Sequence, residues 1–295
     1  QHFFLYHKNS PVQLISSLIG NQPTFYNQPV GSQINGAVLQ FLNNVDVKIM
    51  DQPAGYSQAT MKKIARKYQK AAAKINQTRK NDPSKQTIIF TLSESFSDPE
   101  RVPQMTINKD PMPYLRSLKL KTTSGLMLSS GYGGGTANME YMTLTGFSMS
   151  NFSQTLPTPY TQIVSSLKYN NSFNQIFKYS AAIHPYLGVY YNRVQVYQKF
   201  GFKRFYYLGS KYQIAYQKKI DRSPYLSDQT AYENAIDQVK RKSGGQFINL
   251  ITMQNHYPFN KNFYNSVGFK VSGRAVPSDT DQASAEDFAT GVSLY

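Results

Sequence analysis

The stretch Ser129-Ser-Gly-Tyr-Gly-Gly-Gly-Thr-Ala-Asn-Met-Glu140 joins an expected strand over 122–129 to an expected helix over 137–144. Strands that alternate with amphipathic helices indicate an α/β fold, with a mostly parallel sheet flanked by helices. The glycine run leaves one hydroxyl, that of Thr136, at the start of the helix. Thr136 is a candidate nucleophile if a base or a metal activates it. The alternative is that the glycines form a tight turn and Thr136 only caps the helix.

The same alternation continues along the chain. Further strands are expected over 86–93, 180–184, 204–208 and 246–253, and further helices near 112–120, 160–168, 192–200, 228–242 and 284–295. In open parallel sheets, ligands bind beyond the carboxyl ends of the strands. Glu94, the 133–136 loop, His184 and His256 all follow an expected strand end, which predicts one active site. Either histidine could instead be a structural hydrogen-bonding residue.

Residues 1–85 are predicted to form a helical linker region, and 86–295 a second domain. One helix is expected near 33–44 and a clearer one over 57–79, where Ser57 is a candidate N-cap. The clearer helix carries apolar residues at three- and four-residue steps: Met61, Ile64, Tyr68, Ala71 and Ile75. Its other face carries only basic charges: Lys62, Lys63, Arg66, Lys67, Lys70 and Lys74. That face is either solvated or in contact with an anionic surface.

The composition narrows the classes of function. The 295 residues carry a net charge of +16, which favours polyanionic partners. There is no cysteine, which excludes disulfides and thiolate chemistry. The region 141–220 contains no Asp or Glu, and its Tyr, Lys and Arg suit phosphates and polyols. No recognised motif for nucleic-acid binding accompanies the charge, so no nucleic-acid partner is expected.

Four ordered blocks carry a family resemblance. They are Leu92-Ser-Glu-Ser-Phe96, Gly133-Gly-Gly-Thr-Ala-Asn-Met-Glu140, Asn192-Arg-Val-Gln-Val-Tyr-Gln-Lys-Phe-Gly201 and Asn255-His-Tyr-Pro-Phe259. Together they resemble the extracellular domain of lipoteichoic acid synthases and related phosphoglycerol transferases, over 86–295. The resemblance implies an alkaline-phosphatase/sulfatase-like fold, a Mn²⁺ ion (or Mg²⁺), and transfer of glycerol phosphate from phosphatidylglycerol to a growing polyglycerolphosphate polymer of the lipoteichoic acid type.

The resemblance also implies roles for particular residues. Thr136 matches the nucleophile, which forms a phospho-threonine intermediate and contacts the metal, and Glu94 matches a metal ligand. Substrate-pocket positions are matched by four residues: Arg193, His256, His184 and Tyr191. The family further implies a parent protein at the extracellular face of a Gram-positive-type membrane, anchored by N-terminal membrane helices absent from this chain. An anionic membrane surface is therefore an expected partner.

The chain departs from the family pattern in two places. Tyr186 and Tyr191 stand where the synthases usually carry an Asp and a Trp. No Asp-His pair occurs after His256, although the family's remaining metal ligands form such a pair. We therefore expect a C-terminally incomplete metal site and an inactive or weakly active chain. Two alternatives remain: a non-catalytic module that binds teichoic acid or anionic membrane, and a phosphoethanolamine transferase or hydrolase of the same superfamily.

Overall fold

The computed structural model describes residues 11–25, 28–44, 48–131, 134–242, 244–259 and 262–295. It divides the chain into two compact units, each built from two segments. The first unit comprises Gln1–Asp82 and Ser130–Phe173, and the second comprises Pro83–Ser129 and Asn174–Tyr295. The domain boundary expected at 85/86 stays a prediction.

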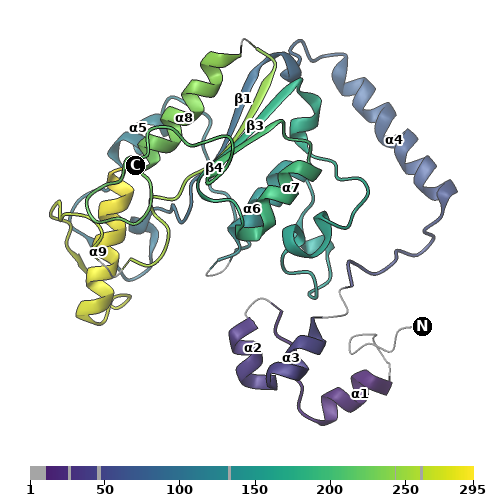
Figure 1. Cartoon of the computed structure of the whole chain (residues 1–295), viewed down its shortest axis with the longest axis horizontal. Helices are drawn as coiled ribbons and strands as arrows, with labels where there is room; N and C mark the ends of the chain where they lie inside the picture. The colour runs from purple at the N-terminus through teal and green to yellow at the C-terminus, as the bar shows by residue number, and fades with distance from the viewer. Residues whose placement is uncertain (1–10, 26–27, 45–47, 132–133, 243, 260–261) are drawn as a thin grey trace. The chain divides into compact units, whose positions relative to one another are not determined.

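A four-stranded parallel sheet forms the centre of the second unit (Figure 1). Its order is β1 (Thr87–Leu92), β5 (Gln246–Ile251), β3 (Tyr179–Leu187) and β4 (Arg204–Leu208). Gln246 lies opposite both Thr87 and Tyr179, so the three strands start in register and their carboxyl ends meet at one edge. This arrangement confirms the predicted mostly parallel α/β fold.

Helices cover both faces of this sheet because its central strands are apolar on both sides. All six residues of β5 are buried. Ile248 and Leu250 face α8 (Asp228–Arg241), whose Ala231 and Ala235 belong to the same core cluster. Since side chains alternate along a strand, Phe247 and Asn249 face the other way. On that side lies α7 (Arg193–Lys199), whose Tyr197 hydroxyl accepts from the Asn249 amide at 3.2 Å.

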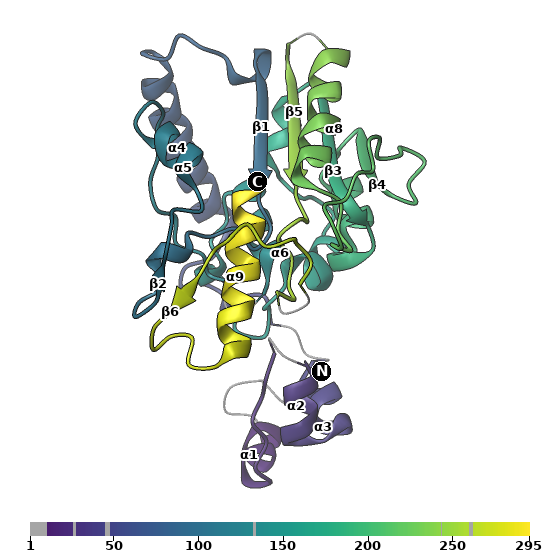
Figure 2. The ribbon, with the colours of Figure 1, turned by 90° about the vertical axis from the view of Figure 1, so that its left-hand side faces the viewer.

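The remaining elements of the second unit lie away from the sheet. They are α5 (Pro113–Lys119), the antiparallel pair β2 (Thr106–Ile107) and β6 (Val271–Ser272), and α9 (Asp279–Ser293), which contacts β6 (Figure 2). Ser278 and Asp281 form a capping box at the start of α9. The helix expected over 284–295 is thus present and begins earlier.

The first unit is mainly helical. It contains α1 (Pro11–Leu18), α2 (Gln28–Asn35), α3 (Ala37–Asn43), α4 (Gln58–Asn76) and α6 (Thr136–Thr145). Ser57 caps α4 as predicted, accepting a hydrogen bond from the Thr60 backbone. The single helix expected near 33–44 is instead two helices, divided at Gly36 with φ of 77°.

Three expectations about local structure were wrong. The segment 122–129 is not a strand; Leu126, Met127 and Leu128 are 73–91% exposed and pair with no described strand, so a sheet cannot satisfy their backbone groups. The helix expected over 160–168 is a five-residue π-helix, Tyr160–Val164. β3 continues past His184 to Leu187, with a register shift between those residues. Among the described residues, no helix combines the length and apolar character needed to cross a bilayer.

Candidate functional site

Glu94 and His256 meet beyond the carboxyl ends of β1 and β5. The strands align Leu92 with Ile251, and the Thr252 amide donates to the Leu92 carbonyl at 3.0 Å. The Thr252 hydroxyl accepts from the Glu94 amide at 3.2 Å. This crosslink holds the Glu94 carboxylate, in a residue that is 8% exposed, 3.9 Å from His256 Nε2. The pair is the geometric centre of the candidate site.

His184 lies on the neighbouring strand β3 and is 2% exposed. Its Nδ1 is 3.5 Å from the Ile251 carbonyl at the end of β5. Burial lowers the pKa of His184 well below its usual range, and the nearby Arg193 charge adds to this effect. At neutral pH the imidazole is therefore neutral, and it can donate or accept a hydrogen bond without adding charge.

Arg193 is the first residue of α7 and is 2% exposed. Tyr191 and Asn192, which precede it, have φ of 54° and 57°. Two consecutive non-glycine residues in the left-handed region are uncommon and cost free energy. The Arg193 guanidinium lies 5.2 Å from the centre of the Tyr191 ring. The turn therefore places a cation, with an aromatic face beside it, at the start of a helix.

An aromatic wall borders the Glu94–His256 pair. The Tyr186 and Tyr190 rings stack at 5.5 Å, and Tyr225 meets Tyr186 edge to face at 5.7 Å. The Tyr225 hydroxyl lies 3.2 Å from His256 Nδ1. Burial, followed by the nearby Tyr186, raises the pKa of Tyr225, so its hydroxyl keeps its proton. Sequence reasoning missed Tyr225, which sits in a loop with no motif; only the abundance of tyrosine hinted at such a wall.

Thr136 belongs to the first unit, whereas the other predicted site residues belong to the second. It is the first helical residue of α6, as predicted, and Gly135, with φ of 79°, occupies the N-cap position. Gly135 rather than Thr136 is thus the N-cap residue, and the role of Thr136 as nucleophile stays a prediction. The structure thus brings together five of the six predicted site residues, Glu94, His184, Tyr191, Arg193 and His256, within the second unit. Gly133 of the predicted loop lies outside the described residues.

The donors do not by themselves fit a complete metal centre. Within the described ranges, no group of three or more His, Asp or Glu side chains comes together. Glu94 and His256 form only a pair, whereas hard cations such as Mg²⁺ prefer about six oxygen ligands.

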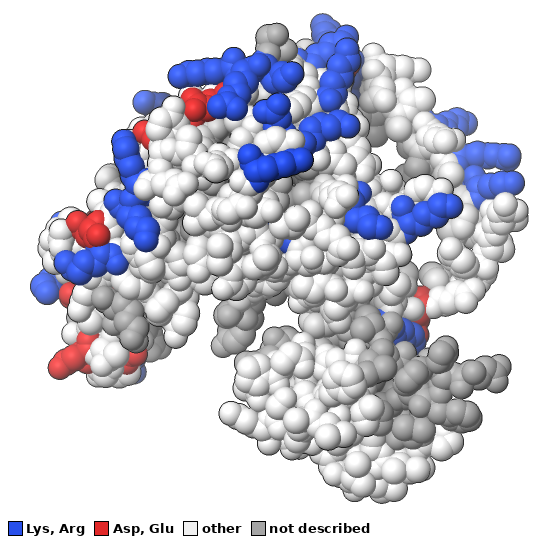
Figure 3. All heavy atoms as spheres, in the orientation of Figure 1, with Lys and Arg blue, Asp and Glu red and all other residues white. Residues whose placement is uncertain are grey.

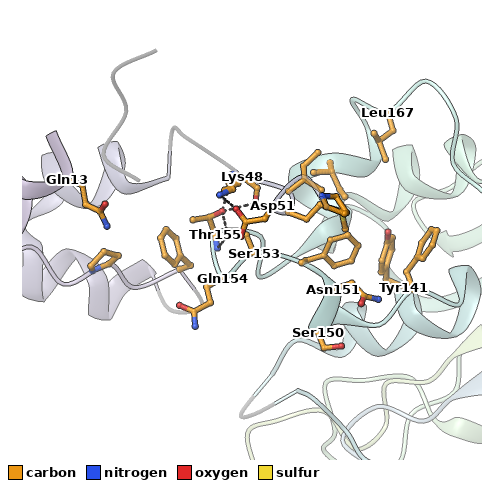
Figure 4. A pocket seen from close by; sticks show the side chains of 18 residues that line it. Gln13, Lys48, Asp51, Tyr141, Ser150, Asn151, Ser153, Gln154, Thr155 and Leu167 are labelled. Carbon is orange, nitrogen blue, oxygen red and sulfur yellow. Dashed lines mark hydrogen bonds and ion pairs between the residues drawn. The ribbon is translucent and has the colours of Figure 1, made fainter. Parts of the chain in front are cut away.

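A cavity of about 1250 Å³ lies in the first unit (Figure 4). The 48–51 segment borders it, and the Thr155 hydroxyl donates to the Lys48 carbonyl at 2.9 Å and accepts from the Lys48 amide at 3.0 Å. Tyr141 of α6 also lines it. None of the six predicted site residues lines this cavity.

Comparison with known proteins identifies the family. The Sulfatase family model matches residues 86–283, and the chain belongs to this family. The chain is 36% identical to the Streptococcus pyogenes phosphoglycerol transferase GacH, solved in complex with sn-glycerol-1-phosphate. That match has a TM-score of 0.77 and covers 83% of this chain and 64% of GacH. The resemblance to phosphoglycerol transferases and the alkaline-phosphatase/sulfatase-like fold are thereby confirmed.

A second relative is a putative cyclic beta-1,2-glucan modification protein of Rhizobium meliloti (strain 1021). It is 31% identical over 272 residues, which is 92% of this chain and 40% of the relative. The lipoteichoic acid synthase LtaP from Listeria monocytogenes is 19% identical over 71% of this chain and 50% of LtaP, with a TM-score of 0.49. The chain therefore spans 40% of its curated relative and less than two thirds of GacH.

Proposed function

We propose that this protein transfers glycerol phosphate from phosphatidylglycerol to a hydroxyl of a cell-envelope polymer. One observation carries the proposal: Glu94, His184, Arg193 and His256 gather at one sheet edge in a chain 36% identical to a phosphoglycerol transferase. A buried guanidinium beside neutral imidazole and carboxylate groups suits a phosphate ester that carries polyol hydroxyls.

The proposed reaction has two displacements at phosphorus. The Thr136 oxygen bonds to the phosphorus of phosphatidylglycerol, the bond from phosphorus to the diacylglycerol oxygen breaks, and the threonine proton ends on diacylglycerol. An acceptor hydroxyl then bonds to the phosphorus of the phospho-threonine intermediate, the bond from phosphorus to the Thr136 oxygen breaks, and the proton of the acceptor hydroxyl ends on Thr136. Splitting the transfer in this way lets lipid and polymer react in turn.

The other residues bind and orient the substrate. Arg193 holds the non-bridging phosphate oxygens in a charge-assisted contact. Neutral His184 and Tyr191 border the phosphate and glycerol groups, and His256 contacts a substrate hydroxyl. The positive end of α6 favours negative charge at Thr136.

The proposed cofactor and cellular location are those that the resemblance to phosphoglycerol transferases implies. We propose Mn²⁺, with Mg²⁺ as the alternative, held in part by Glu94 and Thr136, in an enzyme that works at the extracellular face of the membrane. When bound, the cation would lower the pKa of the threonine hydroxyl. A Mn²⁺ titration by calorimetry, with Glu94→Ala compared to Glu100→Ala, tests this assignment. Equal binding by both variants would remove Glu94 from the ligand set.

A second candidate differs in the acceptor. The Rhizobium relative is named for glucan modification, which favours a glycan hydroxyl over the end of a polyglycerolphosphate chain. The wall of Tyr186, Tyr190 and Tyr225 offers aromatic faces for a sugar ring. Incubating the protein with phosphatidylglycerol and either acceptor, followed by product analysis, separates these two acceptors.

The test of the activity is phosphatidylglycerol turnover together with mass spectrometry of the protein. We expect a glycerophosphate adduct on Thr136, lost in Thr136→Ala and retained in Thr143→Ala, a control on the same helix. Calorimetry with sn-glycerol-1-phosphate and with phosphoethanolamine distinguishes the headgroups without turnover. Tighter binding of phosphoethanolamine, weakened by Arg193→Lys, would favour the phosphoethanolamine transferase instead.

A further inference from the structure

Helix α4 is an amphipathic helix whose two faces are both uncovered. None of its 19 residues is buried. Its large apolar side chains, Met61, Ile64, Tyr68 and Ile75, are 37–64% exposed. Most helices in proteins gain their stability by packing an apolar face against a partner rather than from intrinsic propensity. We therefore expect a binding partner to cover the exposed apolar stripe of α4.

The two faces of α4 are sharply segregated. At 100° per residue, the four large apolar side chains fall within an arc of about 60°. The six Lys and Arg side chains occupy an arc of about 140° centred on the opposite side. No acid occurs between Met61 and Lys80. Figure 3 shows basic side chains along α4. A helix shaped only for water would carry acids four residues from its lysines.

We propose that α4 docks on the surface of an anionic phospholipid bilayer, lying parallel to it with the apolar stripe in the headgroup region. Basic amphipathic helices with an apolar stripe bind such interfaces. The six cations complement anionic headgroups, and long Lys side chains can extend along the helix to reach phosphates. A soluble polyanion would bind the basic face of α4 but leave its apolar stripe exposed to water. An anionic bilayer accommodates both the basic face and the apolar stripe. This surface acts independently of the proposed catalysis.

The chain offers a direct optical test because it contains no tryptophan. Tyr68→Trp places a single reporter on the apolar stripe. With vesicles of equal phosphatidylglycerol and phosphatidylcholine, we expect its emission to shift to shorter wavelength and acrylamide quenching to fall. Pure phosphatidylcholine should produce neither change. Tyr114→Trp, on the exposed side of α5, is the matched control and should not respond.

Paired substitutions test each face by vesicle cosedimentation. Ile64→Gln with Ile75→Gln keeps helix propensity and should lower partitioning roughly tenfold. Lys67→Glu with Lys74→Glu, the two cations nearest the apolar stripe by helical geometry, should lower partitioning at least 25-fold, since each cation near an anionic surface contributes about fivefold.

Control pairs keep the same chemistry away from α4. Leu126→Gln with Leu128→Gln removes exposed apolar groups in the second unit, and Lys218→Glu with Lys219→Glu reverses exposed charges there. Neither pair should alter partitioning. Far-UV circular dichroism of every variant verifies that the fold is retained.

Three results would overturn the proposal. If only the Lys→Glu double substitution weakened vesicle partitioning and the emission of the Tyr68→Trp variant did not change, binding would be simple electrostatic attraction to a polyanion. Loss of a concentration-dependent dimer in the isoleucine pair, without vesicles, would mean that a second copy covers the stripe. Equal partitioning of all variants would remove α4 from membrane binding altogether.

Discussion

Asp228 makes the stability of the protein depend on pH. It is the first residue of α8 and is 2% exposed. The Gln254 amide donates to its Oδ1 at 3.3 Å. Burial, the largest cause, raises the pKa of Asp228 from 3.8 to about 6. The carboxyl therefore costs free energy when it ionises in the folded protein.

The direction and size of the effect follow from linkage. Between pH 4 and 6 the folded state holds more protons on Asp228 than the unfolded state, so stability falls as pH rises. The stabilisation of the folded state by the protonated Asp228 carboxyl is fully present below pH 3.8 and is lost as pH passes about 6. A shift of about two units corresponds to roughly 3 kcal/mol. Asp228→Asn cannot ionise and retains an oxygen acceptor for the Gln254 amide.

The measurement is urea unfolding at pH values from 4 to 7.5, followed by far-UV circular dichroism. Between pH 4 and 7, the stability of Asp228→Asn relative to the unmodified protein should rise by about 2.5 kcal/mol, because part of the shift is already realised at pH 4. Asp279→Asn is the matched control, because Asp279 is the first residue of α9 and is exposed. The reasoning is refuted if the Asp228→Asn difference stays flat, or if the variant loses relative stability as pH rises.

Three further predictions concern packing and the site. Gly291→Ala should destabilise the protein by about 1–3 kcal/mol in urea unfolding, because the new Cβ would lie 2.2 Å from Asn255 Oδ1; an unchanged midpoint would show that the loop yields freely. Arg116→Met should cost about 1–3 kcal/mol, since it leaves three carboxylates without their shared cation, and high salt should shrink the loss. Tyr225→Phe should weaken sn-glycerol-1-phosphate binding several-fold by calorimetry, because it removes the Tyr225 contact of His256 Nδ1, leaves the contact with the Tyr257 carbonyl, and so loosens the ring; unchanged affinity would show that Tyr225 does not position the ring.

Sequence pattern predicted the centre of the sheet well because its central strands, β5 and β3, are buried on both faces. Residues 246–251 form an apolar run between polar turns, and such runs become central parallel strands. The run at 122–129 resembles an apolar strand too, yet it pairs with no strand in the part of the chain that the structure describes. Apolar side chains indicate that a segment prefers to be buried. A strand also needs a neighbouring strand to hydrogen-bond with, and the local sequence does not show whether one is present.

The site was predictable where a side chain follows a strand end, as Glu94 and His256 do. Parallel register then brought residues more than 150 positions apart to 3.9 Å. Tyr225 was not predictable in this way, because its place depends on how a loop folds back over the sheet edge. Likewise, the left-handed turn at Tyr191 leaves no mark in composition, since neither it nor Asn192 is a glycine.

The discontinuous make-up of the two units limits how the chain can be cut. The segment Ser130–Phe173, which carries Thr136, is an excursion from the second unit that joins Gln1–Asp82. Trimming the chain before Pro83 would therefore strip the threonine segment of its companion rather than release an intact catalytic piece. Conversely, β1 pairs with β5 across more than 150 residues, so the sheet closes only after that excursion has been synthesised. Separating the two units would take three cuts, at 82/83, 129/130 and 173/174, so no single truncation point can isolate either of them.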